Sequence, residues 1–222
     1  MDSYITNLKN DTPITTQTYF SKLVDGSMSF ELFKYSQNNF YSAVCYFSRP
    51  MFLLCSKIED YEDRLIILEN IIDEHGNGDI KDSHGVTYKN YLLNLGVKEI
   101  DINKTFNHSA VSNFYSIINN TIENDNIETA LAMFGIMEDR YTEISSSIAN
   151  SLVKNNWLKK DQMSHYKTHK QIDTYHAELF YKLVRHKWIK ETCKADIKKG
   201  LKLGNKLIFD MFNNLLKVEK EE

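Results

Sequence analysis

The sequence predicts an all-α protein, a single bundle of seven to eight helices. Its 222 residues include only two prolines and eight glycines, and a chain so poor in helix breakers can sustain long helices. Apolar residues recur at three- and four-residue spacing, the period of an amphipathic helix, and no convincing stretch alternates as a half-buried strand would. The length suits one domain over 1–222, with loosely packed ends at about 1–13 and 217–222.

Four helices are expected in the first half of the chain. Ser29 fits an N-cap for the second of them, and Pro50 should kink that same helix near its end. The third helix should stop at a turn that contains Gly76 and Gly78, since glycine favours the end of a helix. The expected ranges are 16–23, 29–54, 60–74 and 84–94.

The second half is expected to hold four longer helices. Each carries an apolar side at helical spacing, and the connections between them are short and polar. The expected ranges are 104–122, 128–153, 160–184 and 189–216.

The charges of the chain argue against several classes of partner. Net charge is −3 with both signs mixed, whereas nucleic-acid binding needs a concentrated basic surface. The basic stretch 190–206 is interpreted as a solvated helix face. The first residues resemble no signal peptide, and no apolar run reaches the length of a membrane span. We therefore expect a cytoplasmic protein.

The cysteines indicate neither a disulfide framework nor a zinc site. Cys45, Cys55 and Cys193 are widely spaced and form no CxxC pair. Cys45 and Cys55 lie within aromatic and aliphatic sequence, which favours small apolar core residues over a nucleophile.

Three residues near the end of the chain form the strongest chemical pattern. His169, Asp173 and His176 are separated by four and then three residues. Each residue of an α-helix turns about 100°, so these steps return to nearly the same face. One helix would then offer two imidazoles and a carboxylate to one point, and His165 extends the series by one more turn. The alternative is a polar helix surface that happens to carry histidines.

Three further residues upstream complete a possible metal centre. Glu138 ends the apolar run that begins at Ala132, and a charge in such a setting is rarely buried without a partner or a metal. Glu74 beside its glycine turn and His84 at a helix start are weaker signals, since each is also explained as an ordinary polar residue. Together the six residues suit two metal ions.

The residue types favour iron. Imidazole nitrogen and carboxylate oxygen are ligands that iron takes readily, and the same set suits manganese, which could replace one iron. The helix signature of zinc hydrolases, His-Glu-x-x-His, is absent. The Glu-x-x-His signature of ferritin-like di-iron proteins is also absent.

These motifs resemble those of the haem-oxygenase-like di-iron oxidases and oxygenases. The stretch from Glu69 to His84 is similar to their first metal motif, Met137-Glu138 to their mid-chain glutamate, and His169 to His176 to their C-terminal motif. The flanking segments 30–37 and 40–44 are similar as well, and the likeness covers about 16–216. All six ligand positions carry the expected residue type.

The resemblance implies a helical bundle around two non-haem irons that activate O₂. It implies metal ligation by Glu74, His84, Glu138, His169, Asp173 and His176, with Glu74 and Glu138 as the catalytic carboxylates. Members act on amino acids, amino-acid derivatives and fatty acids by N-hydroxylation, desaturation, oxidative C–C cleavage or decarboxylation. An external electron donor is required, and a homodimer is common for this fold.

Relatives with the same fold supply the alternative functions. Haem oxygenase uses a histidine near its N-terminus, whereas the first histidine here is His75. A metal-free enzyme of the TenA and PqqC type, or a binding or effector protein, would give no role to the six residues that suit a metal. The chlamydial death-domain-associated protein is a di-iron enzyme that makes p-aminobenzoate from its own tyrosine and lysine. The matching positions here are Phe20, with Tyr19 adjacent, and Ile148, which departs from that pattern.

The substrate is expected to enter between helices and to meet aromatic residues. Phe40, Tyr41 and Phe47 are the candidates for this lining. If the substrate is an amino acid, Arg140 or Arg49 is expected to bind its carboxylate, because a guanidinium binds carboxylates in a fork.

Overall fold

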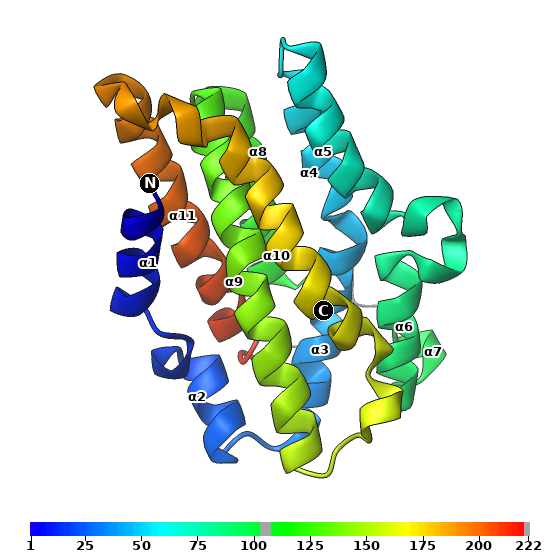
Figure 1. Ribbon diagram of the computed structural model, residues 1–222. Coiled ribbons are helices and arrows are strands. Elements are labelled where there is room, and N and C mark those ends of the chain that lie inside the picture. Colours follow the sequence, from blue (N-terminus) through cyan, green and yellow to red (C-terminus); the bar gives the residue numbers. More distant parts are fainter. Residues whose placement is uncertain (103–107, 220–222) are drawn as a thin grey trace.

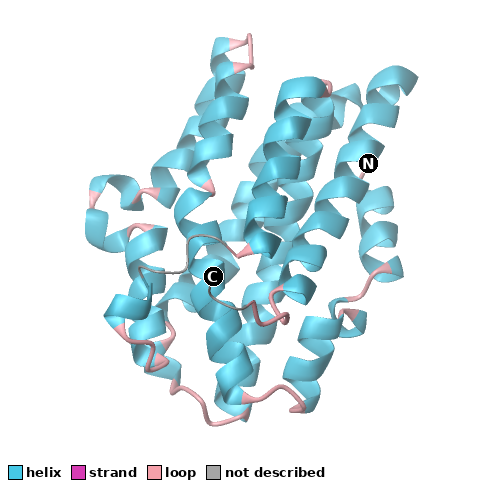
Figure 2. Cartoon of the chain, turned by 180° about the vertical axis from the view of Figure 1, so that it is seen from behind, coloured by secondary structure: helices cyan, strands magenta, loops and turns pink. Residues whose placement is uncertain are grey.

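The described part of the chain contains helices and no strands, which confirms the all-α prediction (Figure 2). The computed structural model describes residues 1–102 and 108–219, and the side chains of residues 161, 164 and 167–173 lie outside the described part. Two predicted ligands, His169 and Asp173, fall in this last group.

The helices of the first half match the expected ranges closely, with two additions, α1 and α7. Short 3₁₀ turns lie at Ile14–Thr16, Gly76–Gly78 and Ile80–Asp82. The helices are α1 Asp2–Asp11, α2 Thr18–Asp25, α3 Phe30–Tyr46, α4 Ser48–Ser56, α5 Tyr61–Glu74, α6 His84–Asn94 and α7 Glu99–Ile102.

The second half of the chain supplies the long helices of the bundle. These are α8 Ser109–Asn124, α9 Ile127–Lys154, α10 Ser164–Arg185 and α11 Glu191–Asn214, with 3₁₀ turns at Lys160–Gln162 and His186–Ile189. Helices α9, α10 and α11 run side by side through the middle, with α1 and α2 along one edge and α5 to α7 along the other (Figure 1).

Helix α9 is the central element because it packs along both α10 and α11. Its contact with α11 depends on two glycines one turn apart. A Cβ at Gly200 would overlap the carbonyl oxygen of Thr129, and one at Gly204 would overlap that of Met133. The missing side chains let the two helix backbones touch, which fixes α9 and hence the position of Glu138.

The helix expected over 29–54 is divided into α3 and α4 at Phe47. Pro50 is the cause, since a proline ring clashes with the carbonyl four residues earlier, here that of Tyr46, and cannot donate a hydrogen bond to it. The predicted kink is therefore present, one turn before the proline.

The N-terminal segment differs from the loosely packed end that we expected. Residues 2–11 form α1, which buries Ile5 and is bound at its C-terminal end by Arg140. Cys45, expected in the core, is exposed, whereas Cys55 is buried. No helix in the described ranges is both long enough and apolar enough to span a membrane.

A buried glutamine joins four helices through a cluster of tyrosines. The Oε1 atom of Gln37 accepts hydrogen bonds from the hydroxyls of Tyr88, Tyr91 and Tyr166 at 3.0, 3.1 and 2.6 Å. Its Nε2 atom donates to the hydroxyl of Tyr19 at 2.9 Å. All five side chains are essentially inaccessible to solvent. This tyrosine cluster ties the start of α10 to α2, α3 and α6.

Candidate metal centre

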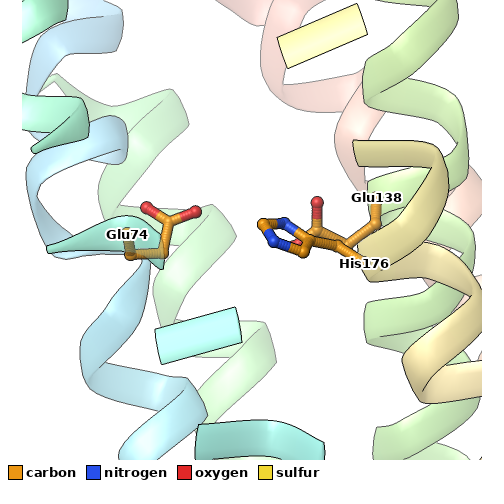
Figure 3. A group of neighbouring side chains, drawn as sticks. All are labelled: Glu74, Glu138 and His176. Atoms are coloured by element: carbon orange, nitrogen blue, oxygen red, sulfur yellow. The ribbon is translucent and has the colours of Figure 1, made fainter. Parts of the chain in front are cut away.

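Three ligand-type side chains from three helices converge inside the bundle. Glu74 is the last residue of α5, Glu138 lies in the middle of α9, and His176 lies on α10. Each offers one ligand atom, and these atoms lie within 4.8 Å of one another. In Figure 3, Glu74 faces Glu138 and His176 across a short gap.

A glycine turn brings His84 beside Glu74, although ten residues separate them. Gly76 has a φ of +73°, and a Cβ on it would lie 2.5 Å from the backbone nitrogen of Ser83. The close approach, which only glycine allows without strain, folds the chain back at once. As a result, His84 Nδ1 lies 2.8 Å from Glu74 Oε2, and both side chains are less than one-tenth exposed.

Glu138 is buried, as its apolar sequence context predicts. It is 4% exposed, and Asn70 Nδ2 on α5 donates to its Oε1 over 3.4 Å. Asn70 is itself fully buried and lies one helical turn before Glu74. Helix α5 therefore supplies one carboxylate of the centre and supports the other.

His176 is held by a residue that the sequence did not single out. Its Nε2 lies 3.0 Å from Oδ2 of Asp73. A carboxylate only accepts, so Nε2 carries a proton, and in the neutral imidazole the lone pair is then on Nδ1. Nδ1 is buried and has no hydrogen-bond partner among the described residues, which is the state a metal-binding imidazole requires. Asp73 adjoins Glu74 in the sequence, but nothing in the sequence alone shows that it reaches α10.

The donor set fits iron. Two buried carboxylates within 4.8 Å of each other repel unless a cation or a proton lies between them. Carboxylate oxygen and imidazole nitrogen, without thiolate, suit iron or manganese. Glu74, His84, Glu138 and His176 would hold the metal, while Asp73 and Asn70 would orient two of these ligands.

Two predicted ligands cannot be placed. The side chains of His169 and Asp173 lie outside the described residues, so their part in the centre stays a prediction. His165, one turn earlier, is buried. Its Nδ1 lies 3.1 Å from Oγ1 of Thr87 on α6, and its ring meets that of His84 edge-on at 6.1 Å. His165 therefore belongs to the wall of the centre.

A small cavity of about 60 Å³ adjoins these ligands. Glu74, His84, Glu138 and His165 form its polar wall, and the rest is mostly apolar. The apolar part includes Phe40, Ala43, Val44, Phe47, Phe114, Tyr115, Met137, Tyr141, Ile208 and Met211. Two of the aromatic residues expected there, Phe40 and Phe47, line it. Tyr41 is not among the lining residues; its ring stacks on Tyr88 at 6.2 Å.

Arg140 is occupied elsewhere and does not line the cavity. It is 1% exposed. Its guanidinium donates to Asn205 Oδ1 at 2.7 Å, to Glu143 Oε2 at 2.8 Å and to the carbonyl of Thr12 at 3.1 Å. It therefore fastens α1 to α9 and α11. A substrate carboxylate would have to displace all these oxygens to reach it.

Comparison with solved structures shows a haem-oxygenase-like fold. A domain of unknown function with that fold from Shewanella denitrificans superposes with a TM-score of 0.78 at 13% identity, over 96% of this chain and 89% of the other. A TenA homologue from Pseudomonas syringae gives 0.73 at 13% identity, over 97% and 92%. A TenA homologue from P. horikoshii gives 0.71 at 17% identity, over 96% and 98%. The resemblance inferred from the motifs is confirmed at the level of the fold.

Sequence comparison identifies the family. No curated protein is similar enough in sequence to be matched. The model of a family described as iron-containing redox enzymes matches residues 35–207, a range that contains every predicted metal ligand. The chain belongs to this family of iron-containing redox enzymes.

Proposed function

We propose that this protein is an O₂-activating non-haem di-iron oxidase or oxygenase that acts on a small molecule. The observation that carries the proposal is the convergence of Glu74, Glu138 and His176 within 4.8 Å, with a lone pair of His176 left without a partner among the described residues. The class of substrate is an amino acid, an amino-acid derivative or a fatty acid. Two irons, when bound, would supply electrons to O₂, and an external donor would restore them.

The side chains of this chain perform the supporting tasks. Asp73 keeps the proton on Nε2 of His176 and thereby directs Nδ1 to the metal. His84 and Asn70 hold one oxygen each of Glu74 and Glu138. Phe40, Phe47 and their apolar neighbours keep bulk water from the reacting groups.

Anaerobic iron loading tests the proposal directly. The protein is loaded with Fe(II), freed of excess metal and assayed for iron per chain, with a ratio close to two expected. His176→Ala should lose iron and O₂ consumption and remain folded, whereas His186→Ala, an exposed histidine beyond the end of α10, should lose neither. An iron ratio near zero in folded protein would refute the proposal and favour a metal-free enzyme of the TenA type or a binding protein.

Two further measurements separate the remaining alternatives. The intact mass after turnover should be unchanged; a loss of mass from the chain would indicate self-sacrifice of the p-aminobenzoate type. Loading with Mn(II) and Fe(II) together would show whether manganese takes one position. We also propose a homodimer, since α5 leaves Leu65 and Ile72 about half exposed; sedimentation velocity measures this.

A further inference from the structure

A second, larger hollow lies at the kink between α3 and α4. Its volume is about 320 Å³. One wall runs along one face of α3, where Ser42, Cys45 and Tyr46 are spaced by three and one positions, and continues past the kink to Arg49 on α4. The other wall is α8. The lining includes Ser42, Cys45, Tyr46 and Arg49 on the first wall and Ser112 and Tyr115 on the second.

Arg49 stands apart from the other three arginines of the chain. Arg64, Arg140 and Arg185 each donate hydrogen bonds to protein oxygens. Arg49 is exposed, and its side chain makes no hydrogen bond or ion pair within the described ranges; its guanidinium carbon lies 5.1 Å from the centre of the Tyr46 ring. The stacking leaves the N–H groups at the edge of the guanidinium available to an anion.

The hollow carries no opposing charge. None of its described lining residues is acidic. Cys45 is exposed as a residue, but the side chains around the hollow partly desolvate its thiol and raise the thiol pKa, so the thiol is neutral at physiological pH. The Ser112 hydroxyl can donate a further hydrogen bond, whereas the Ser42 hydroxyl already donates to the carbonyl of Asn39 at 3.0 Å. A guanidinium with a hydroxyl donor nearby and no carboxylate is a site for a carboxylate or a similar anion.

Tyr115 is the one described residue that lines both this hollow and the metal cavity. Its hydroxyl donates to the carbonyl of Ala43, a cavity residue. Its ring meets that of Tyr46 edge-on at 4.1 Å. Tyr115 lines the metal cavity together with Glu74, and burial, followed by the charge on Glu74, raises the pKa of its phenol well above the usual range. A single aromatic side chain therefore forms the shared wall.

We propose that the hollow at the α3–α4 kink is the vestibule for an anionic small molecule, with Arg49 binding its carboxylate and Tyr115 as the partition to the metal cavity. This inference rests on the proposed function, since it takes that cavity as the place of reaction. It narrows the substrate to a molecule with an acid group at one end and an apolar part that reaches past Tyr115. The reacting carbon or nitrogen then lies away from the acid group.

The first test measures charge selection at Cys45 and needs no iron. Alkylation of Cys45 by anionic iodoacetate and by neutral iodoacetamide is compared by peptide mass spectrometry, with Cys193 as the internal reference. In Arg49→Gln the iodoacetate rate should fall roughly fivefold relative to iodoacetamide, the effect of a unit charge about 4 Å away in water. Arg49→Lys should restore most of the iodoacetate rate, and Arg64→Gln should leave the ratio of the two rates unchanged. An unchanged ratio in Arg49→Gln would overturn the assignment of Arg49.

The second test asks whether the hollow leads to the cavity. Ala43→Cys places a thiol in the cavity wall, and its alkylation by iodoacetamide is followed in metal-free protein. Tyr115→Ala should accelerate this reaction, and Tyr115→Phe, which keeps the ring, should do so much less. Ser112→Trp fills the hollow and should slow the alkylation at position 43. Asn113 is exposed and lies outside the lining, so Asn113→Trp should leave the rate unchanged. Equal rates in the two tryptophan variants would refute the vestibule, independently of the iron count that decides the proposed function.

Discussion

Two polar clusters are buried in this bundle, and they are satisfied in opposite ways. In the tyrosine cluster, Gln37 accepts three phenol hydrogens and donates to a fourth hydroxyl, and every group is neutral. In the metal centre, Glu74 and Glu138 converge, and Nδ1 of His176 has no partner among the described residues. The first cluster is complete within the described residues, whereas the second leaves a nitrogen of His176 without a partner among them and sets two carboxylates close together.

The tyrosine cluster serves the stability of the fold, whereas the metal centre serves function. A buried, fully hydrogen-bonded network stabilises one arrangement of helices. A buried pair of like charges opposes folding until a metal binds, and the binding free energy then stabilises the folded state. The tyrosine cluster should therefore support the metal-free bundle that the metal centre weakens.

Alkaline pH should break the tyrosine cluster with the largest effect. Burial raises the pKa of Tyr19, Tyr88, Tyr91 and Tyr166 above the usual 10. A group with a raised folded-state pKa contributes its full stability below the unfolded pKa and loses it as pH rises. Above pH 10 each phenol lowers the free energy of unfolding by about 1.4 kcal/mol per pH unit, and the four together lower it by about 5.5 kcal/mol per pH unit. Phenolate absorbance should rise together with the loss of helical circular dichroism. Ionisation of all four while the helices persist would contradict this.

Gln37→Leu should break the same cluster at neutral pH. Tyr91 and Tyr166 lose their acceptor, at about 1–2 kcal/mol each, whereas Tyr88 keeps the backbone carbonyl of residue 37 at 3.1 Å. The free energy of unfolding should therefore fall by about 2–4 kcal/mol. Urea denaturation of metal-free protein measures it. Glu31→Gln, exposed on the same helix, is the control and should change little. A loss below about 1 kcal/mol would show that the phenols find other partners.

Asp73→Ala should weaken the metal centre and spare the fold. The imidazole of His176 loses the carboxylate that fixes its tautomer, and removal of such a partner typically lowers metal affinity about 10- to 100-fold. Fe(II) titration under argon measures the affinity. Glu69→Ala is the matched control, because Glu69 lies on the same helix and accepts a hydrogen bond from the neighbouring Tyr175. Equal losses in both variants would assign the effect to α5 as a whole.

Glu138→Gln should have the smallest effect on stability, and it should stabilise the metal-free protein rather than destabilise it. In metal-free protein the substitution removes the charge of one of two adjacent buried carboxylates. The free energy of unfolding should therefore rise by about 1–2 kcal/mol. With Fe(II) present, wild-type protein should be stabilised and the variant should not. Urea denaturation with and without Fe(II) measures the free energy of unfolding in both states. A variant that is less stable than wild type in the absence of metal would show that Glu138 is needed for packing.

The sequence predicts the helices better than the contacts between them. Periodicity gave α9 within one residue at each end, and the apolar run before Glu138 predicted its burial. Asp73 was missed because its role depends on how α5 meets α10, which no local pattern encodes. Arg140 was a candidate for the substrate carboxylate because a guanidinium binds carboxylates in a fork. Its partners are instead carbonyls and side chains of α1 and α11.

The N-terminal helix shows a second limit of local patterns. Its sequence is polar, and only Ile5 is fully buried, so periodicity gives no strong signal. The guanidinium of Arg140, from more than a hundred residues away, binds the carbonyls at its end. Elements that are fixed by such distant polar contacts cannot be recognised from their own residues.

The turn at Gly76 has a consequence for how such a centre can evolve. Helix packing positions Glu138 and His176, so a change to either helix affects the whole bundle. The spacing between Glu74 and His84 depends on a short surface connection, and surface connections tolerate insertions and deletions at low cost. Natural selection can therefore alter one side of the metal centre by editing a few residues of a loop, while the bundle is inherited unchanged.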